Sequence, residues 1–136
     1  MDAPDLFLYE YSVVRYVPRV DREEFVNIGL VMMCKRQKWL RGEILINEEK
    51  VKAFCKNANI NALAGQTSLF MRNDVPSAEI PVEERYRWLV AVKSAVIQVS
   101  PSHPGLLVTN PNDGNGENDS AGLDAEFNRL FTELVK

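Results

Sequence analysis

The sequence contains few of the residues from which catalytic and metal sites are built, with one histidine, two cysteines and seven glycines among 136 residues. Cys34 and Cys55 form no C-x-x-C pair, and they have no recognisable metal-ligand spacing with His103. The glycines are scattered, which excludes a glycine-rich phosphate loop. There is no serine elbow, and a single histidine in a turn with two prolines is a poor general base. We therefore expect no metal, no cofactor and no catalytic residue.

Long apolar runs are also missing. The longest run, from Ile28 to Cys34, is far shorter than the ~20 residues that span a bilayer. The first residues are acidic and lack the basic and apolar regions of a signal peptide. Nothing in the sequence indicates secretion, so we expect no disulfide between the two cysteines. These features predict a cytoplasmic protein without a membrane segment.

The net charge of −3 is small and negative. It disfavours a domain that coats nucleic acid without specificity, because such domains are usually basic. The charges are nevertheless uneven, since residues 15–41 carry seven basic and three acidic side chains, whereas residues 112–126 carry five acids and no base. Three interpretations stay open: the two segments bind each other, they bind a partner, or both are solvated.

Alternating apolar residues predict an antiparallel meander of three strands over Phe7–Val17, Phe25–Cys34 and Trp39–Ile46. A short apolar segment at Leu106–Thr109 is a candidate fourth strand. Both faces of the second strand are mostly apolar, which is typical of a central strand or one covered on both sides. One of these faces consists of the even positions Val26, Ile28, Leu30, Met32 and Cys34.

Helical periodicity begins after the third strand. Glu48–Asn57 follows Asn47, which is a good N-cap residue, and has acids in its first turn. Leu123–Val135 carries one apolar stripe that must dock on the rest of the domain. Residues 61–72 are ambiguous, because their apolar residues allow a short helix that a glycine and a polar run weaken.

The longest predicted helix, Val82–Val99, is apolar nearly all round and is expected to pack centrally on the sheet. Tyr86 and Trp88 are then core residues. The predicted fold class is α+β, a two-layer domain in which an antiparallel sheet of three or four strands packs against about three helices. We assign residues 1–136 to a single domain, with a mobile acidic loop at residues 110–122.

Polar side chains interrupt the first two predicted strands and the turn between them. Arg15 and Asn27 lie within apolar runs, with Arg22 and Glu24 close by in the sequence. An unpaired polar group inside a sheet costs about 1–3 kcal/mol, so we expect Arg15 or Arg22 to pair with Glu24, and Asn27 to pair with backbone. Gly29 in mid-strand indicates a bulge or a close backbone approach. We expect one connected cluster within paired strands, which either fixes the hairpin register or binds an anion or a partner.

The pattern R-Y-x-P, followed after a short gap by R-x-E-F-x-N-x-G and two aliphatic residues, covers this same segment. It resembles the opening of the bacterial domain-of-unknown-function family number three-zero-three-seven, and the resemblance continues through Ser100-Pro101 and the closing Leu130-Phe131 and Leu134-Val135. That family has no established activity, so the resemblance implies no catalytic role. It does imply a protein partner, because members are often encoded beside a HipA-like kinase. The matching residues are Arg15, Tyr16, Pro18, Arg22, Glu24, Phe25, Asn27, Gly29, Leu30 and Val31.

The leading hypothesis is a small cytoplasmic interaction or regulatory protein, accessory to a HipA-like kinase, rather than an enzyme. One alternative is a nucleic-acid-binding protein that uses the basic hairpins of residues 15–41, with an affinity that falls steeply as salt rises. The other alternative is a small enzyme for an anionic substrate, in which Arg15 and Arg22 clamp the anion and Glu24 acts as acid or base.

Overall fold

A five-stranded antiparallel sheet forms the centre of the computed structural model, in the order β3-β2-β1-β4, with β5 also paired to β1. The structure describes residues 5–70, 80–91, 96–109 and 120–136. The α+β class and the meander of the first three strands are confirmed, and the strands number five instead of three or four. Their bounds are β1 (Asp5–Tyr16), β2 (Val26–Cys34), β3 (Trp39–Ile44), β4 (Ile97–Val99) and β5 (His103–Thr109).

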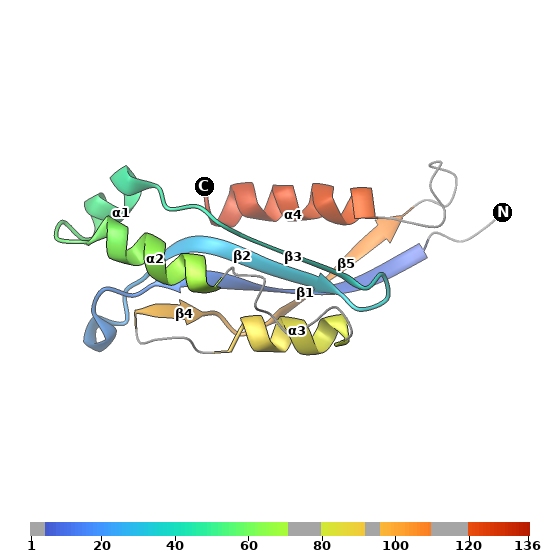
Figure 1. The fold of residues 1–136 in the computed structure, drawn as a ribbon. Helices are drawn as coiled ribbons and strands as arrows, with labels where there is room; N and C mark the ends of the chain where they lie inside the picture. The colour runs from blue at the N-terminus through green and yellow to red at the C-terminus, as the bar shows by residue number, and fades with distance from the viewer. Residues whose placement is uncertain (1–4, 71–79, 92–95, 110–119) are drawn as a thin grey trace.

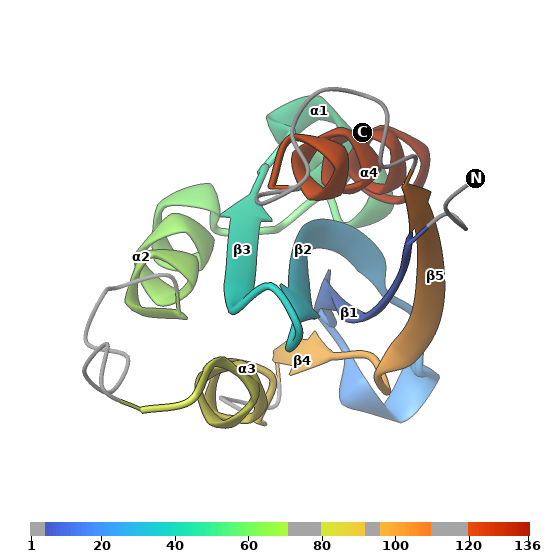
Figure 2. The ribbon, with the colours of Figure 1, turned by 90° about the vertical axis from the view of Figure 1, so that its right-hand side faces the viewer.

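Helices cover both faces of this sheet (Figures 1 and 2). The core is accordingly divided into two clusters, one shared with α1, α2 and α3 and the other shared with α4. The prediction of two layers and about three helices is wrong in these details, since four helices are described and they lie on both faces of the sheet. Helices on both sides follow from a central strand with two apolar faces, each of which must be buried. The helix bounds are α1 (Glu48–Phe54), α2 (Ile60–Phe70), α3 (Val82–Leu89) and α4 (Ser120–Leu134), with a 3₁₀ turn, η1, at Val20–Arg22.

A β-bulge in β2 changes the direction of its side chains. The register pairs Val14 with Gly29 and the next residue, Arg15, with Asn27, so that Ile28 is an extra residue opposite β1. The prediction of one continuous apolar face is therefore wrong, because a period of two cannot pass through a bulge unchanged. Val26 and Ile28 belong to the core cluster of α1–α3, whereas Leu30, Met32 and Cys34 belong to the cluster of α4.

Gly29 also meets a neighbouring backbone, as its position in mid-strand predicted. A Cβ atom built on it would lie 2.8 Å from the carbonyl oxygen of Glu43 and would overlap the Cδ1 atom of Ile44. Both atoms belong to β3, so a side chain at this position would separate β3 from β2. Glycine is required here for space, and the bulge and the close approach occur together.

The predicted helix Val82–Val99 is wrong at its C-terminal end, and residues 92–95 lie outside the described part of the chain. α3 ends at Leu89, and Ile97–Val99 forms β4, which pairs with the C-terminal part of β1. The β-branched residues of that segment suit a strand, and an apolar pattern on all sides does not by itself distinguish a buried helix from a buried strand. Tyr86 is buried in the core as expected, but Trp88 is 45% exposed, so its assignment to the core is also wrong.

β4 and β5 lie end to end along one side of β1, and β2 lies along the other side. The registers show this, because residues of β1 that pair with β2 pair at the same time with a residue of β4 or of β5. Ser100 bridges the break between them. Its N–H donates to the carbonyl of Val13 at 2.8 Å, and its hydroxyl accepts from the N–H of Val13 at 2.8 Å. The predicted fourth strand is thus confirmed, and it begins at His103 rather than Leu106.

α4 begins at Ser120, three residues earlier than predicted, so the end of the expected loop 110–122 is helical. Residues 110–119 lie outside the described part of the chain. At the start of α4, Asp124 accepts a hydrogen bond from Arg41 of β3 at 3.0 Å. The basic and acidic segments therefore bind each other at this point. Within the four described segments, no helix has both the length and the apolar character needed to cross a bilayer.

Candidate functional site

The four predicted site residues fall into two separate pairs. Arg15 and Asn27 lie opposite each other in β1 and β2. Arg22 and Glu24 lie outside the sheet, in the turn that joins these strands. Among the described residues, the polar contacts of Arg22 and Glu24 stay within the turn, and Asn27 bonds elsewhere. The expected embedding in paired strands thus holds for Arg15 and Asn27 alone, and the four side chains do not form one connected cluster.

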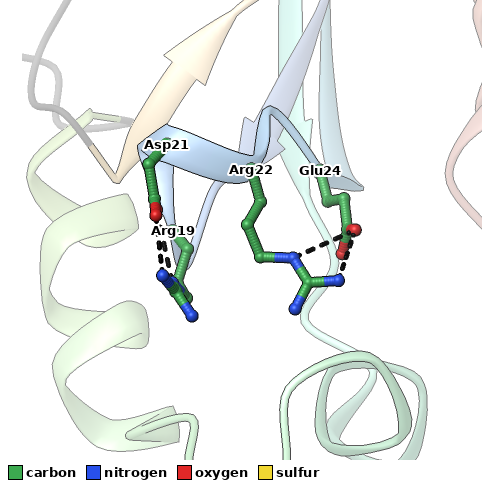
Figure 3. Close-up of polar contacts among 4 residues, drawn as sticks. All are labelled: Arg19, Asp21, Arg22 and Glu24. Atoms are coloured by element: carbon green, nitrogen blue, oxygen red, sulfur yellow. Dashed lines mark hydrogen bonds and ion pairs between the residues drawn. The ribbon is translucent and has the colours of Figure 1, made fainter.

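Two ion pairs lie within the turn between β1 and β2, as Figure 3 shows. The guanidinium of Arg22 donates to Glu24 Oε1 at 2.9 and 3.2 Å, which decides between the two partners predicted for Glu24. Arg19 binds Asp21 in the same way, at 2.6 Å. Both pairs are more than half exposed, and exposed pairs of this kind contribute about 0–1 kcal/mol. With Glu23, the turn carries three acids against two bases, so it offers an anion no net positive charge.

A small hollow of about 190 Å³ lies beside this turn. Its volume is below the roughly 300–1,000 Å³ of ordinary small-molecule pockets. Cys55 at the end of α1 lines it, and burial together with a hydrogen bond to this thiol raises the pKa of Tyr16 above its usual value. The hollow therefore brings polar groups together without the depth of a substrate pocket. Its lining residues are Pro18, Arg19, Arg22, Glu24, Phe54 and Cys55.

Asn27 and Lys50 attach the end of the last helix to the rest of the domain. Asn27 Nδ2 donates to the carbonyl of Leu134 at 2.9 Å, and Lys50 Nζ donates to the carbonyl of Val135 at 2.7 Å. The last carbonyls of a helix have no partner within it and carry partial negative charge, so these side chains cap the end of α4. The predicted pairing of Asn27 with backbone is confirmed. This geometry favours the structural interpretation of Asn27.

The guanidinium of Arg15 lies 4.0 Å from the centre of the Phe25 ring, a cation–π contact. Arg15 Nε and Asn27 Oδ1 are both buried, and neither has a hydrogen-bond partner within the described chain. One atom is a donor and the other an acceptor, and they belong to directly opposed residues. The pair therefore holds one donor and one acceptor that are buried and unpartnered among the described residues.

A groove of about 680 Å³ lies beside β3, and the sequence patterns did not predict it. α2 lies on one side of it and α4 on the other. The only available signal was the position of β3 as the last strand of the meander, which makes it an edge strand. The lining residues are Glu43, Ile44, Leu45, Ile46, Ala64, Thr67, Asn128, Phe131, Thr132 and Lys136.

The outer edge of β3 presents backbone groups to this groove. Within the described chain, β3 pairs with β2 alone. The N–H of Leu45 points to β2, since it donates to the carbonyl of Ile28 at 2.7 Å. Backbone direction alternates along an antiparallel strand, so Gly42 and Ile44 direct their N–H and C=O groups outward. Such an edge is a template for a further strand.

The described residues include no group of three histidine, cysteine or acidic side chains placed to hold a metal ion. Both cysteines are free, with Cys34 buried beneath α4 and Cys55 half-buried at the end of α1.

A comparison with protein-family models matches residues 11–115 to the family described as "Protein of unknown function (DUF3037)". The match contains the R-Y-x-P pattern, both pairs of site residues and β3, and it confirms the resemblance seen in the sequence. Neither a curated protein nor a solved structure matches the chain significantly. Because the match covers well over half of the 136 residues, the chain belongs to the DUF3037 family.

Proposed function

We propose that this protein is a small interaction domain that binds an extended segment of a partner protein along the outer edge of β3. The groove of about 680 Å³ beside that edge carries the proposal. The edge supplies backbone donors and acceptors that no described strand pairs with, and the groove supplies space for the side chains of a bound segment. Addition of a strand to an exposed sheet edge is a common mode of peptide recognition, in which the main chain supplies affinity and the side-chain pockets supply specificity.

The groove has the two walls that an added strand needs. Ala64 and Thr67 of α2 line it from one face of the sheet, and Asn128 and Thr132 of α4 line it from the other. Successive side chains of a strand point to opposite faces, so a bound segment directs its side chains alternately toward α2 and α4. Apolar side chains of the partner are favoured, because the lining also contains Ile44, Leu45, Ile46 and Phe131.

The basic hairpins offer less positive charge than the sequence indicated. At least four of their seven basic residues form an ion pair with a carboxylate of this chain. A phosphate backbone would have to compete with these carboxylates. The structure therefore adds no support to the nucleic-acid alternative or to an enzyme with arginine clamps. The paired residues are Arg19, Arg22, Lys35 and Arg41.

A HipA-like kinase is the first partner to test, because the family resemblance implies it, and we place both proteins in the cytoplasm. The experiment measures the affinity of the purified chain for the HipA-like kinase of its host by titration calorimetry. Ala64→Arg places a long charged side chain in the groove and is expected to weaken binding at least tenfold. Ala62→Arg is the matched control, since Ala62 is exposed on the same helix but does not line the groove.

Two results would count against the proposal. Equal affinities of Ala64→Arg and Ala62→Arg would remove the groove as the binding site. Absence of binding by the unmodified chain at micromolar concentrations would remove the kinase as the partner. Thr132→Arg, on the wall formed by α4, tests the second wall and is expected to act in the same direction as Ala64→Arg.

A further inference from the structure

The opposite edge of the sheet has the features of a contact between two copies of this chain. β5 is the outermost strand there, since among the described strands it pairs only with β1. This edge is distinct from the groove beside β3, so an inference about it does not depend on the proposed function.

The side chains of this edge are apolar and exposed. Leu106 and Val108 of β5 are 54% and 58% exposed, and their cross-strand neighbours Leu8 and Leu6 are 63% and 51% exposed. The register places Leu6 opposite Val108 and Leu8 opposite Leu106, so the four residues form one patch. Large exposed apolar side chains gathered in this way are typical of an interaction surface.

The neighbouring helices leave this patch uncovered. The alternate residues of the same strands, among them Phe7 and Leu107, point to the other face and pack with α4. α3 covers the patch face only farther along β1, where the hydroxyl of Tyr86 lies 2.8 Å from that of buried Ser12. The apolar face at the start of β1 and along β5 therefore extends beyond the helices that bury the rest of the sheet.

The backbone of β5 points outward at the same residues. Val13 exchanges hydrogen bonds with Ser100, so the odd residues of β1 direct their backbone toward β4 and β5. Their partner Leu107 is then bonded to β1, and Leu106 and Val108 present N–H and C=O groups to the outside. Pro104 shares this outward set, so it costs no hydrogen bond to β1, but it has no N–H for an added strand. The outward donors are therefore those of Leu106 and Val108.

The residues of β5, from His103 to Thr109, include no Lys, Arg, Asp or Glu. Edge strands are commonly protected from association by such charges. A twofold axis pairs a strand antiparallel with its own copy, and an uncharged strand places no like charges opposite each other. The other edge differs, because β3 carries Arg41 and Glu43 and lies between two helices. β5 is thus the edge suited to self-pairing.

We propose that two copies of this chain associate through antiparallel pairing of β5 with β5, which joins their sheets into one. Leu106 and Val108 then gain apolar neighbours across the twofold axis. The groove beside β3 stays open in both copies, at the two outer edges of the joined sheet. A dimer of this kind presents two partner sites that face away from each other.

Sedimentation velocity of the full chain over a range of concentrations tests this proposal. The expected species has twice the monomer mass of 15.4 kDa. Leu106→Lys and Val108→Lys each place like charges across the axis and are expected to raise the dimer dissociation constant at least tenfold. Phe54→Lys is the matched control, because Phe54 is an exposed apolar residue of α1 outside this patch, and this variant is expected to remain dimeric.

Three outcomes would overturn the proposal. One is an unmodified chain that is monomeric at every concentration tested. Another is a Phe54→Lys variant as monomeric as Leu106→Lys, which indicates that the loss of association is not specific to β5. The third is a dimer that both lysine substitutions on β5 leave unchanged. Circular dichroism of each variant shows that the fold is retained, and having two edge variants keeps the test decisive if one of them unfolds.

Discussion

Asn27 donates a hydrogen bond from Nδ2 to the main-chain carbonyl of Leu134, 2.9 Å away and 107 positions later in the chain. The asparagine of the R-x-E-F-x-N-x-G pattern therefore binds the C-terminal end of the last helix. Its partner is one of the carbonyls that a helix end cannot satisfy itself. A residue at the start of the sheet thus holds α4 against the face on which the second core cluster lies.

Asn27→Ala is expected to lower the free energy of unfolding by about 1–2 kcal/mol, because a part-buried helix carbonyl loses its donor. Urea unfolding followed by circular dichroism measures this change. Asn61→Ala is the control, since Asn61 is an exposed residue of α2, and it is expected to change stability by less than about 0.5 kcal/mol. Equal stabilities of the two variants would show that the hydrogen bond to Leu134 does not hold α4.

Arg22→Ala and Glu24→Ala are expected to remain folded. Their ion pair is exposed, and removing it should change the free energy of unfolding by less than about 1 kcal/mol. Because both variants are expected to stay folded, a loss of anion binding in either variant would not result from unfolding. A gel shift with duplex DNA at 50 mM salt that is present for the unmodified chain and lost in Arg22→Ala would favour that alternative over the present proposal. We expect no shift for either protein.

Two glycines give opposite expectations for the same substitution. Gly29→Ala should destabilise the protein by about 1–3 kcal/mol or more, because the new methyl group overlaps β3 in the core. Gly65→Ala in α2 meets nothing within 4 Å and should stabilise it by about 0.5–1 kcal/mol, through higher helix propensity. Thermal unfolding of both variants compares them directly. A harmless Gly29→Ala would contradict the close approach between β2 and β3.

The stability of the protein should fall in alkaline solution partly through Tyr9. Burial, followed by the hydrogen bond to Glu126, raises the pKa of Tyr9 from 10.0 to about 12. As the pH rises, the Tyr9 hydroxyl therefore loses its proton in the unfolded chain before it does so in the folded chain. The stabilisation that Tyr9 gives the folded state is complete below pH 10 and is lost as the pH rises through about 12. This difference in pKa between the folded and unfolded states corresponds to about 2–3 kcal/mol in the free energy of unfolding.

Tyr9→Phe isolates this contribution from that of other alkaline groups. At pH 7 the variant is expected to be about 1 kcal/mol less stable, because the hydrogen bond to Glu126 is missing. Between about pH 10 and 12 the unmodified chain should lose stability faster than the variant, and the two curves should converge or cross. Parallel curves of unfolding free energy against pH would refute the raised pKa of Tyr9.

Local patterns in the sequence were sufficient for the front half of the fold. The three strands of the meander follow from alternation of apolar residues, and Asn47 caps α1 as predicted, with its side chain accepting from the N–H of Lys50 at 3.2 Å. Gly29 indicated the bulge because a glycine in mid-strand has few other uses. In each case the energy that decides the structure acts between residues close together in the chain.

The same kind of pattern failed over residues 82–99. An apolar run long enough for one helix was divided into α3 and β4, because β1 had a free edge that a short strand was able to pair with. Pairing with a distant strand outweighs a weak local preference. The bulge at Ile28 likewise limited the prediction for β2. Gly29 indicated the bulge, but the sequence did not show that the bulge divides the even residues of β2 between the two core clusters.

The sequence alone determined the α+β class, the antiparallel order of the first strands, the family and the need for glycine at position 29. Only the tertiary structure decided that Asn27 and Lys50 cap the same helix end, that Arg22 and Glu24 stay apart from them, and that a groove lies beside β3. The physical reason is the range of the interactions. Periodicity and capping act over a few residues, whereas these contacts and grooves are formed by segments that chain collapse brings together from distant positions.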